Sequence, residues 1–89
     1  MFFITLTKWK QKPSKKMQAT IDQATKTFED LKKQGIKMRI YWTIGRYDAV
    51  TIMEAPTEKD AMKILLPFQE IVDTETMIAV PREEAIKLI

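Results

Sequence analysis

Two kinds of hydrophobic periodicity alternate along this chain, and their order restricts the fold more than any other feature does. Residues 2–9 are rich in aromatic and β-branched side chains, which is typical of a strand. Apolar residues then recur at spacings of four, three, four and three, which is a helical period. This stripe consists of Met17, Ile21, Ala24, Phe28 and Leu31. We predict a strand followed by an amphipathic helix, with Ser14 as its N-cap and Gly35 just past its end.

A hairpin of two strands is expected next. Residues 36–44 alternate between apolar and polar side chains, and residues 48–54 alternate again after the short turn formed by Gly45, Arg46 and Tyr47. Alternation with a period of two predicts strands, and the short turn predicts that they pair. In the first strand of this hairpin, the apolar side is formed by Ile36, Met38, Ile40, Trp42 and Ile44.

The last third of the chain repeats the pattern of a helix followed by a strand. Thr57 should begin a second helix, with Asp60 at the acidic position of a capping box. Pro67 should end the regular part of this helix near Leu66. Its apolar face comprises Ala61, Ile64, Leu65 and Phe68. Residues 73–80 predict a fourth strand, and Pro81 should open a short terminal helix that Ile86 and Ile89 would anchor.

This order of elements, βαββαβ, indicates an α+β domain of the ferredoxin-like type. We expect a four-stranded antiparallel sheet with two helices on one face, because both crossovers are right-handed, and a short C-terminal helix. The 89 residues fit a single domain, residues 1–89. A chain this short buries a small core, and contact between subunits would add to it. We therefore expect a homodimer or a higher homo-oligomer.

The composition excludes several kinds of chemistry. The chain contains no cysteine and no histidine, which excludes disulfides, thiolate catalysis, a Ser-His triad and a histidine-based zinc or haem site. Its two glycines are too few for a phosphate-binding Gly-rich loop. Four carboxylates could in principle share a cation, but their spacing in the sequence is not that of a metal-binding motif. They belong to Asp48, Glu54, Asp73 and Glu75. We expect no metal and no cofactor.

The positive charge is concentrated in one stretch. The net charge is +3, and five lysines lie between residues 8 and 16, namely Lys8, Lys10, Lys12, Lys15 and Lys16. We interpret this stretch as a solvated link; contact with a polyanion, with Trp9 as a stacking surface, is the alternative. Since the net charge is small and no binding motif is present, nucleic acid is not an expected partner. No stretch is long and apolar enough for a membrane span, and we expect a cytoplasmic protein without membrane contact.

The sheet face opposite the helices is the part most informative about function. If Ile4 and Leu6 face the helices, the open face carries Phe3, Thr5, Thr7, Trp9, Lys37, Arg39, Tyr41, Thr43, Ala49, Thr51 and Met53. A face in water is normally more polar than this, and an apolar patch often marks a partner surface or a ligand site. We predict that a second copy packs its sheet on this face, with Phe3, Tyr41 and Met53 in the interface. The alternative is that these residue types are simply favoured in exposed strands.

The segment 45–56, GRYDAVTIMEAP, resembles the signature of the GYD domain family. The family pattern is Gly, any residue, Tyr and Asp, then an apolar strand and commonly Glu-Ala-Pro. The places of that pattern are filled by Gly45, Tyr47, Asp48, Glu54, Ala55 and Pro56. Residues 74–77, Glu83 and Glu84 are similar to the last strand and tail of the family. The lysine-rich stretch departs from the pattern. The resemblance implies a small prokaryotic protein of the dimeric α/β-barrel superfamily, with no established activity.

Three functions are compatible with these features. The first, which we favour, is an oligomeric binding or regulatory module with a small-molecule cavity between the sheets, lined by Thr5, Trp9, Tyr41, Thr43 and Thr51. The second is an enzyme that acts in this cavity through Arg39, Tyr47 or Asp48, with Arg46 supplying positive charge. The third is a structural or protein-interaction subunit. The turn also has a purely structural interpretation, in which Gly45 adopts a positive φ and Asp48 accepts backbone hydrogen bonds.

Overall fold

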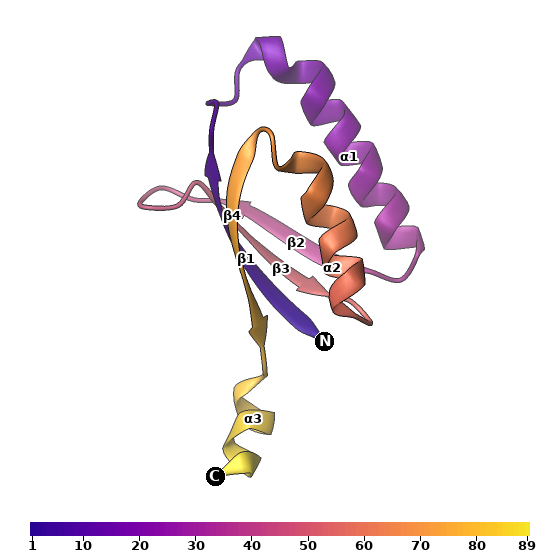
Figure 1. Cartoon of the computed structure of the whole chain (residues 1–89), viewed down its shortest axis with the longest axis vertical. Helices are drawn as coiled ribbons and strands as arrows, with labels where there is room; N and C mark the ends of the chain where they lie inside the picture. The colour runs from indigo at the N-terminus through magenta and orange to yellow at the C-terminus, as the bar shows by residue number, and fades with distance from the viewer.

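The elements form in the order that the two periodicities predict. The computed structural model describes all 89 residues. Its strands are β1 (Phe2–Trp9), β2 (Lys37–Trp42), β3 (Ala49–Glu54) and β4 (Val72–Ala79), and its helices are α1 (Gln18–Lys33), α2 (Glu58–Leu65) and α3 (Arg82–Ala85). The strands form one antiparallel sheet in the order β2-β3-β1-β4, with α1 and α2 on the same face (Figure 1). The fold is α+β and ferredoxin-like, as predicted.

Local signals set the ends of the helices. Gly35 has φ of 88° and follows α1, where a left-handed conformation is needed. The backbone N–H of Thr57 donates to Asp60 Oδ2 at 3.1 Å, as part of the predicted capping box. Pro67 ends α2, and the chain continues as a 3-10 turn, Leu66–Phe68. Ser14 precedes a 3-10 turn, Lys15–Met17, so α1 itself begins later than predicted.

The pairing register decides which side chains share a face, and it shows that part of the prediction was wrong. Phe3 lies opposite Met53, and Met53 lies opposite Met38 of β2. Thr5 lies opposite Thr51, and Thr51 lies opposite Ile40. Directly paired residues project on the same side of a sheet. The odd-numbered residues of β1 and β3 therefore share the helix-covered face with the apolar side of β2.

The residues that the sequence placed on the open face are thus divided. Lys37, Arg39 and Tyr41 do lie there, but Phe3, Thr5, Thr7, Trp9, Ala49, Thr51 and Met53 face the helices. Phe3 and Met53 are 2% and 1% exposed, so neither can form an interface with a second copy. Sequence alternation failed on β1 because both of its sides are apolar, with Phe2, Ile4 and Leu6 on one side and Phe3 and Trp9 on the other.

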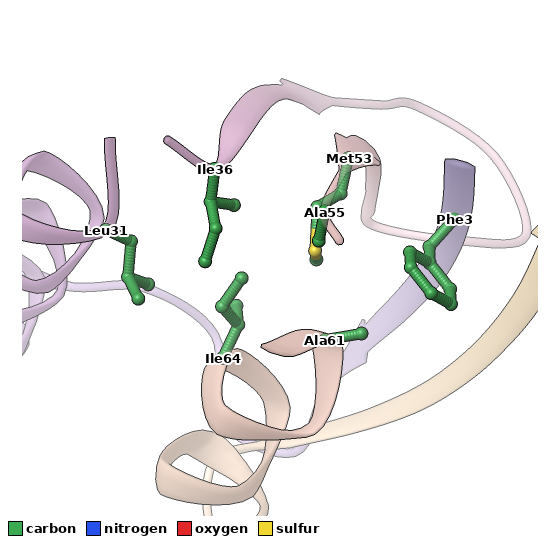
Figure 2. Packing of buried hydrophobic residues seen from close by; sticks show 7 residues of the cluster. All are labelled: Phe3, Leu31, Ile36, Met53, Ala55, Ala61 and Ile64. Carbon is green, nitrogen blue, oxygen red and sulfur yellow. The ribbon is translucent and has the colours of Figure 1, made fainter. Parts of the chain in front are cut away.

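The hydrophobic core is small and lies at one end of the sheet. It consists of Phe3, Leu31, Ile36, Met53, Ala55, Ala61 and Ile64. Figure 2 shows Leu31, Ile36 and Ile64 converging between α1, β2 and α2, with Met53, Ala55 and Phe3 facing Ala61. Only nine of the 89 residues are buried. Phe28 and Met38 pack against this core and are only partly buried.

The open face of the sheet has an apolar centre. Its central strands contribute Ile4 and Leu6 from β1 and Val50 and Ile52 from β3, with Tyr41 and Met77 beside them on the two edge strands. Tyr41, Ile52 and Met77 are each more than two fifths exposed. The centre of the open face is therefore apolar, although apart from Tyr41 the residues that form it differ from those predicted.

The C-terminal segment extends beyond the sheet. After β4, the helix α3 and the 3-10 turn Ile86–Leu88 project from the end of the strand (Figure 1). Ile86 is 45% exposed and Ile89 is fully exposed, so the prediction that they anchor this segment was wrong for the single chain. Ile44, predicted in the second strand, is also fully exposed, because β2 ends at Trp42 and the hairpin loop leaves the sheet.

Candidate functional site

A cavity of about 370 Å³ lies between the helices and the sheet. Its floor is the helix-facing side of all four strands, and its other walls come from α1, the end of α2 and the Leu66–Phe68 turn. None of its lining residues carries a charge or titrates near neutral pH. The helix stripe predicted from the sequence forms the roof: Met17, Ile21, Ala24 and Phe28 line the cavity, while Leu31 enters the core.

The floor of the cavity is rich in threonine. Thr5 lies between Thr51 and Thr76 in the sheet, and Thr7 lies beside Thr74. The hydroxyls of Thr5 and Thr76 are hydrogen-bonded to each other at 2.9 Å. The hydroxyls of Thr7, Thr51 and Thr74, whose residues line the cavity, make no hydrogen bond within the chain and are open to solvent, since Thr74 is exposed and no buried side-chain oxygen lacks a partner. The floor therefore offers three unpaired hydroxyl groups, each of which can donate or accept a hydrogen bond.

Aromatic rings form the walls at two places. Trp9 and Trp42, from the ends of β1 and β2, pack edge to face with ring centroids 4.9 Å apart and planes at 70°. Phe28 of α1 and Phe68 pack at 5.7 Å between centroids and 45° between planes. Such pairs hold rings in defined orientations and give large apolar surfaces. The cavity thus combines aromatic walls with a hydroxyl-bearing floor.

The hairpin loop between β2 and β3 is tied to β1 by Asp48. The backbone N–H of Trp9 donates to Asp48 Oδ2 at 2.9 Å, and the N–H of Asp48 donates to the carbonyl of Thr7 at 2.8 Å. The hydroxyl of Thr43 donates to the carbonyl of Tyr47 at 2.7 Å. Gly45 has φ of 142°, as the structural interpretation of this turn predicts. Asp48 therefore positions the backbone of Trp9, which in turn places its indole ring at the cavity wall.

We expect Asp48→Ala to lower the free energy of unfolding by about 1–3 kcal/mol, because it leaves the N–H of Trp9 without its charged acceptor. Asp48→Asn keeps a side-chain oxygen that can accept the same hydrogen bond, and we expect it to lose less than half as much. Urea denaturation monitored by circular dichroism measures the loss of stability in both variants. Equal losses in the two variants, or no loss in Asp48→Ala, would contradict this role.

The site residues predicted from the sequence fall into three separate groups. Thr5, Trp9 and Thr51 line the cavity. Arg39 and Tyr41 lie on the open face. The third group, in the hairpin loop, is Thr43, Arg46, Tyr47 and Asp48. None of the residues in the second and third groups lines the cavity.

Tyr47 is surrounded by charged side chains rather than by a pocket. Its hydroxyl donates to Glu75 Oε2 at 3.2 Å. The Arg46 guanidinium carbon is 5.7 Å from its ring centroid, and Lys8 Nζ is 5.8 Å from it. These contacts link the loop to β1 and β4, and they make Tyr47 part of a surface network.

Several cavity residues were not among the predicted site residues. The main ones are Thr7, Phe28, Trp42, Phe68 and Thr74. Trp42 was predicted on the helix-facing side of its strand, and Phe28 and Phe68 on apolar helix faces. The sequence contains no signal that a space would remain between these apolar faces. Only the spacing of the helices above the sheet shows it.

The lysine-rich stretch does not form one surface. Lys8 lies on the open face near Tyr47, whereas Lys10 Nζ donates to the carbonyl of Gln69 at 2.7 Å and lies 3.7 Å from Asp73. No group of three or more acidic side chains is close enough together to hold a metal ion. None of the helices has the length and apolar character that crossing a membrane requires.

Comparison with known protein families agrees with the resemblance of the 45–56 segment. The family model described as the GYD domain matches residues 3–89, essentially the whole chain. No curated protein matches the chain. The match therefore shows the family, while the fold and the chemistry of the cavity come from the structure of this chain.

Proposed function

The chain belongs to the GYD domain family, and from the structure of this member we propose that it binds a small, mostly apolar organic molecule between its helices and its sheet, as a homo-oligomer. The observation that carries this proposal is the uncharged cavity of about 370 Å³. Its volume lies within the range of about 300–1,000 Å³ that is typical of ligand pockets. The space is partly open to solvent, since Ile40 and Trp42 in its lining are exposed, and apolar surface in contact with water is favourably covered. A bound molecule would cover this surface.

Binding is favoured over catalysis by the side chains that line the cavity. None of them can act as a general acid or base at neutral pH, because the lining holds no carboxylate, lysine or tyrosine. The residues suggested for an enzyme, namely Arg39, Tyr47 and Asp48, lie outside it. The cavity expected between two sheets is therefore replaced in this proposal by the cavity on the helix side, where Thr5, Trp9 and Thr51 lie.

A second copy of the chain is the occupant that we propose for the open face. Around the apolar centre, the β2 edge carries Lys37 and Arg39, and the β4 edge carries Asp73 and Glu75. A twofold axis parallel to the strands would place the β2 edge of one copy over the β4 edge of the other. This axis keeps positions along the strands, so Tyr41 would face Glu75 of the second copy around a shared apolar centre. Arg39 would lie one row of side chains, about 7 Å, from that Glu75, within reach of its long side chain.

The remaining charges on the open face keep this balance. Lys8 of β1 and Glu54 of β3 add one positive and one negative charge at opposite ends of the central strands. A face with both signs in equal number suits a copy of itself better than a polyanion. This arrangement supports a homodimer and gives no support to nucleic acid as a partner.

We expect Ala24→Phe to prevent ligand retention, because Ala24 lines the cavity and a larger ring would fill it. Ala19→Phe is the matched control, since Ala19 is exposed on the same helix and does not line the cavity. Native mass spectrometry of protein taken from cell extract should show an additional small mass on the wild type and on Ala19→Phe. Ala24→Phe should lack that mass while keeping its helical circular dichroism.

A purely structural subunit is the alternative that this experiment separates. It predicts that each wild-type oligomer has the mass of its polypeptide chains alone, with no additional small mass. Such a result, or equal retention by Ala24→Phe, would overturn the binding proposal.

A further inference from the structure

We infer that the ligand is a flat, uncharged ring compound with a polar edge that bears a hydroxyl or carbonyl group. This inference rests on the proposed function and names the chemical class that the cavity would accept. It follows from three properties of the lining: the absence of charge, the position of the free hydroxyl groups and the arrangement of the aromatic rings.

Charge is the property that excludes most classes of metabolite. An ion that enters an apolar space without a partner of opposite charge loses its hydration, which is costly. No lysine or arginine lines the cavity. Lys10, near its edge, already donates to the carbonyl of Gln69, and Lys12, which lies between the lining residues Gln11 and Pro13, is exposed. Carboxylates, phosphates and ammonium compounds are therefore poor ligands for this cavity.

The free hydroxyl groups make the sheet side of the cavity more polar than its helix side. The unpaired hydroxyls of Thr7, Thr51 and Thr74 are all on the sheet. Thr51 is in the row of Thr5, and Thr7 and Thr74 are in the next row on that face, about 7 Å further along the strands.

The roof opposite the floor offers few hydrogen bonds. Its stripe of Met17, Ile21, Ala24 and Phe28 is apolar. Of the polar side chains near it, Thr25 already donates to the carbonyl of Ile21 at 3.0 Å, and Gln11 and Thr20 are exposed, whereas Thr7 and Thr51 on the floor are partly buried. A ligand would therefore hydrogen-bond on its sheet side and make apolar contacts on its helix side.

The aromatic pairs favour a flat ligand over a flexible chain. Trp9 and Trp42 meet at 70°, so that one ring presents its edge to the face of the other, and Phe28 and Phe68 flank the cavity from the helix side. A planar ring can add to such groups by offset or edge contacts while losing little conformational entropy. Aromatic hydroxyl and carbonyl compounds combine this shape with the required polar edge.

Three probes with the same ring test the inference: 2-naphthol, 2-naphthoate and naphthalene. The chain has two tryptophans, and both line the cavity. Their two indole N–H signals in a ¹⁵N–¹H correlation spectrum thus report binding there, and Trp9→Phe assigns them. We expect 2-naphthol, neutral at pH 7, to shift both signals and to bind at least about 10-fold more tightly than 2-naphthoate.

The variant Thr7→Val/Thr51→Val tests the polar edge, since valine keeps the shape of threonine and removes the hydroxyl. It should weaken 2-naphthol about 3- to 10-fold and leave naphthalene unchanged. Thr27→Val, on α1 and outside the lining, should change neither.

Each outcome decides a separate point. Binding of 2-naphthoate as tight as that of 2-naphthol would overturn the uncharged class but leave cavity binding intact. No loss in the double variant would overturn the polar edge. If none of the probes shifts an indole signal, the ring class is wrong, and the small mass retained in native mass spectrometry decides whether the binding proposal stands.

Discussion

Met53→Ala is expected to lower the free energy of unfolding by about 2–5 kcal/mol, the range for removing a fully buried large side chain. Met53 is 1% exposed and lies between Phe3 of β1 and Met38 of β2 in the core. Phe3, Ile36 and Ile64 are also buried, and Met53 helps to line the cavity, so its removal enlarges a space that is already present. Domain stabilities are typically about 5–15 kcal/mol, so this loss would consume a large share of the total.

Met62→Ala is the matched control, because it makes the same chemical change at a residue that is 52% exposed on α2. We expect it to change stability by about 0.5 kcal/mol or less. Urea denaturation of both variants and the wild type at one protomer concentration measures the difference, since association adds to apparent stability. A loss below about 1 kcal/mol in Met53→Ala, or equal losses in the two, would refute the assignment of Met53 to the core.

Ile52→Glu is expected to convert the proposed dimer into monomers. Ile52 lies on the open face, opposite Ile4 on β1 and Arg39 on β2, and it is 44% exposed in the single chain. Burying a carboxylate between two sheets costs several kcal/mol of desolvation, which pairing with the neighbouring Arg39 would offset only in part. The dissociation constant should therefore rise at least about 100-fold. Sedimentation velocity across a range of protein concentrations measures it.

Ile44→Glu controls for the added charge, since Ile44 is fully exposed in the hairpin loop and lies off the sheet. It should leave the dimer intact. The orientation is tested by Arg39→Glu, which should weaken association, and by Arg39→Glu/Glu75→Arg, which should restore part of it because the signs on the two edges are exchanged. A wild-type monomer at micromolar concentration, or a dimer unaffected by Ile52→Glu, would contradict the proposed interface.

Met53 and Ile52 are neighbours on β3, and they show how far the sequence predicts the faces of the sheet. Alternation placed Met53 and Ile52 on opposite sides of β3, which is correct. It could not say which of these sides the helices cover. Phe2, Ile4 and Leu6 on β1 are as apolar as Phe3 and Trp9, so no contrast in polarity selects the buried side. The choice depends on pairing between residues about 50 positions apart, such as Phe3 with Met53.

The cavity could be predicted only in part for a related reason. Thr5, Trp9 and Thr51 were expected to line a ligand site together, and they do line one cavity. The sequence-based interpretation placed that cavity on the wrong side of the sheet, because these residues were assigned to the open face. Phe28 and Phe68 were identified as apolar helix positions, but a periodic stripe is the same whether the space beneath it is filled or empty.

The sequence by itself determined the order and kind of the secondary-structure elements, the ends of the helices at Gly35, Asp60 and Pro67, and the family. These depend on the spacing of residues that are near one another in the chain, and local sterics and hydrogen bonds act over that range. Only the tertiary structure decided which side of β1 is buried, that a space remains beneath α1, and that the C-terminal segment leaves the sheet. These depend on how distant elements pack, and packing is set by shape and volume across the whole fold, which hydrophobic patterns do not encode.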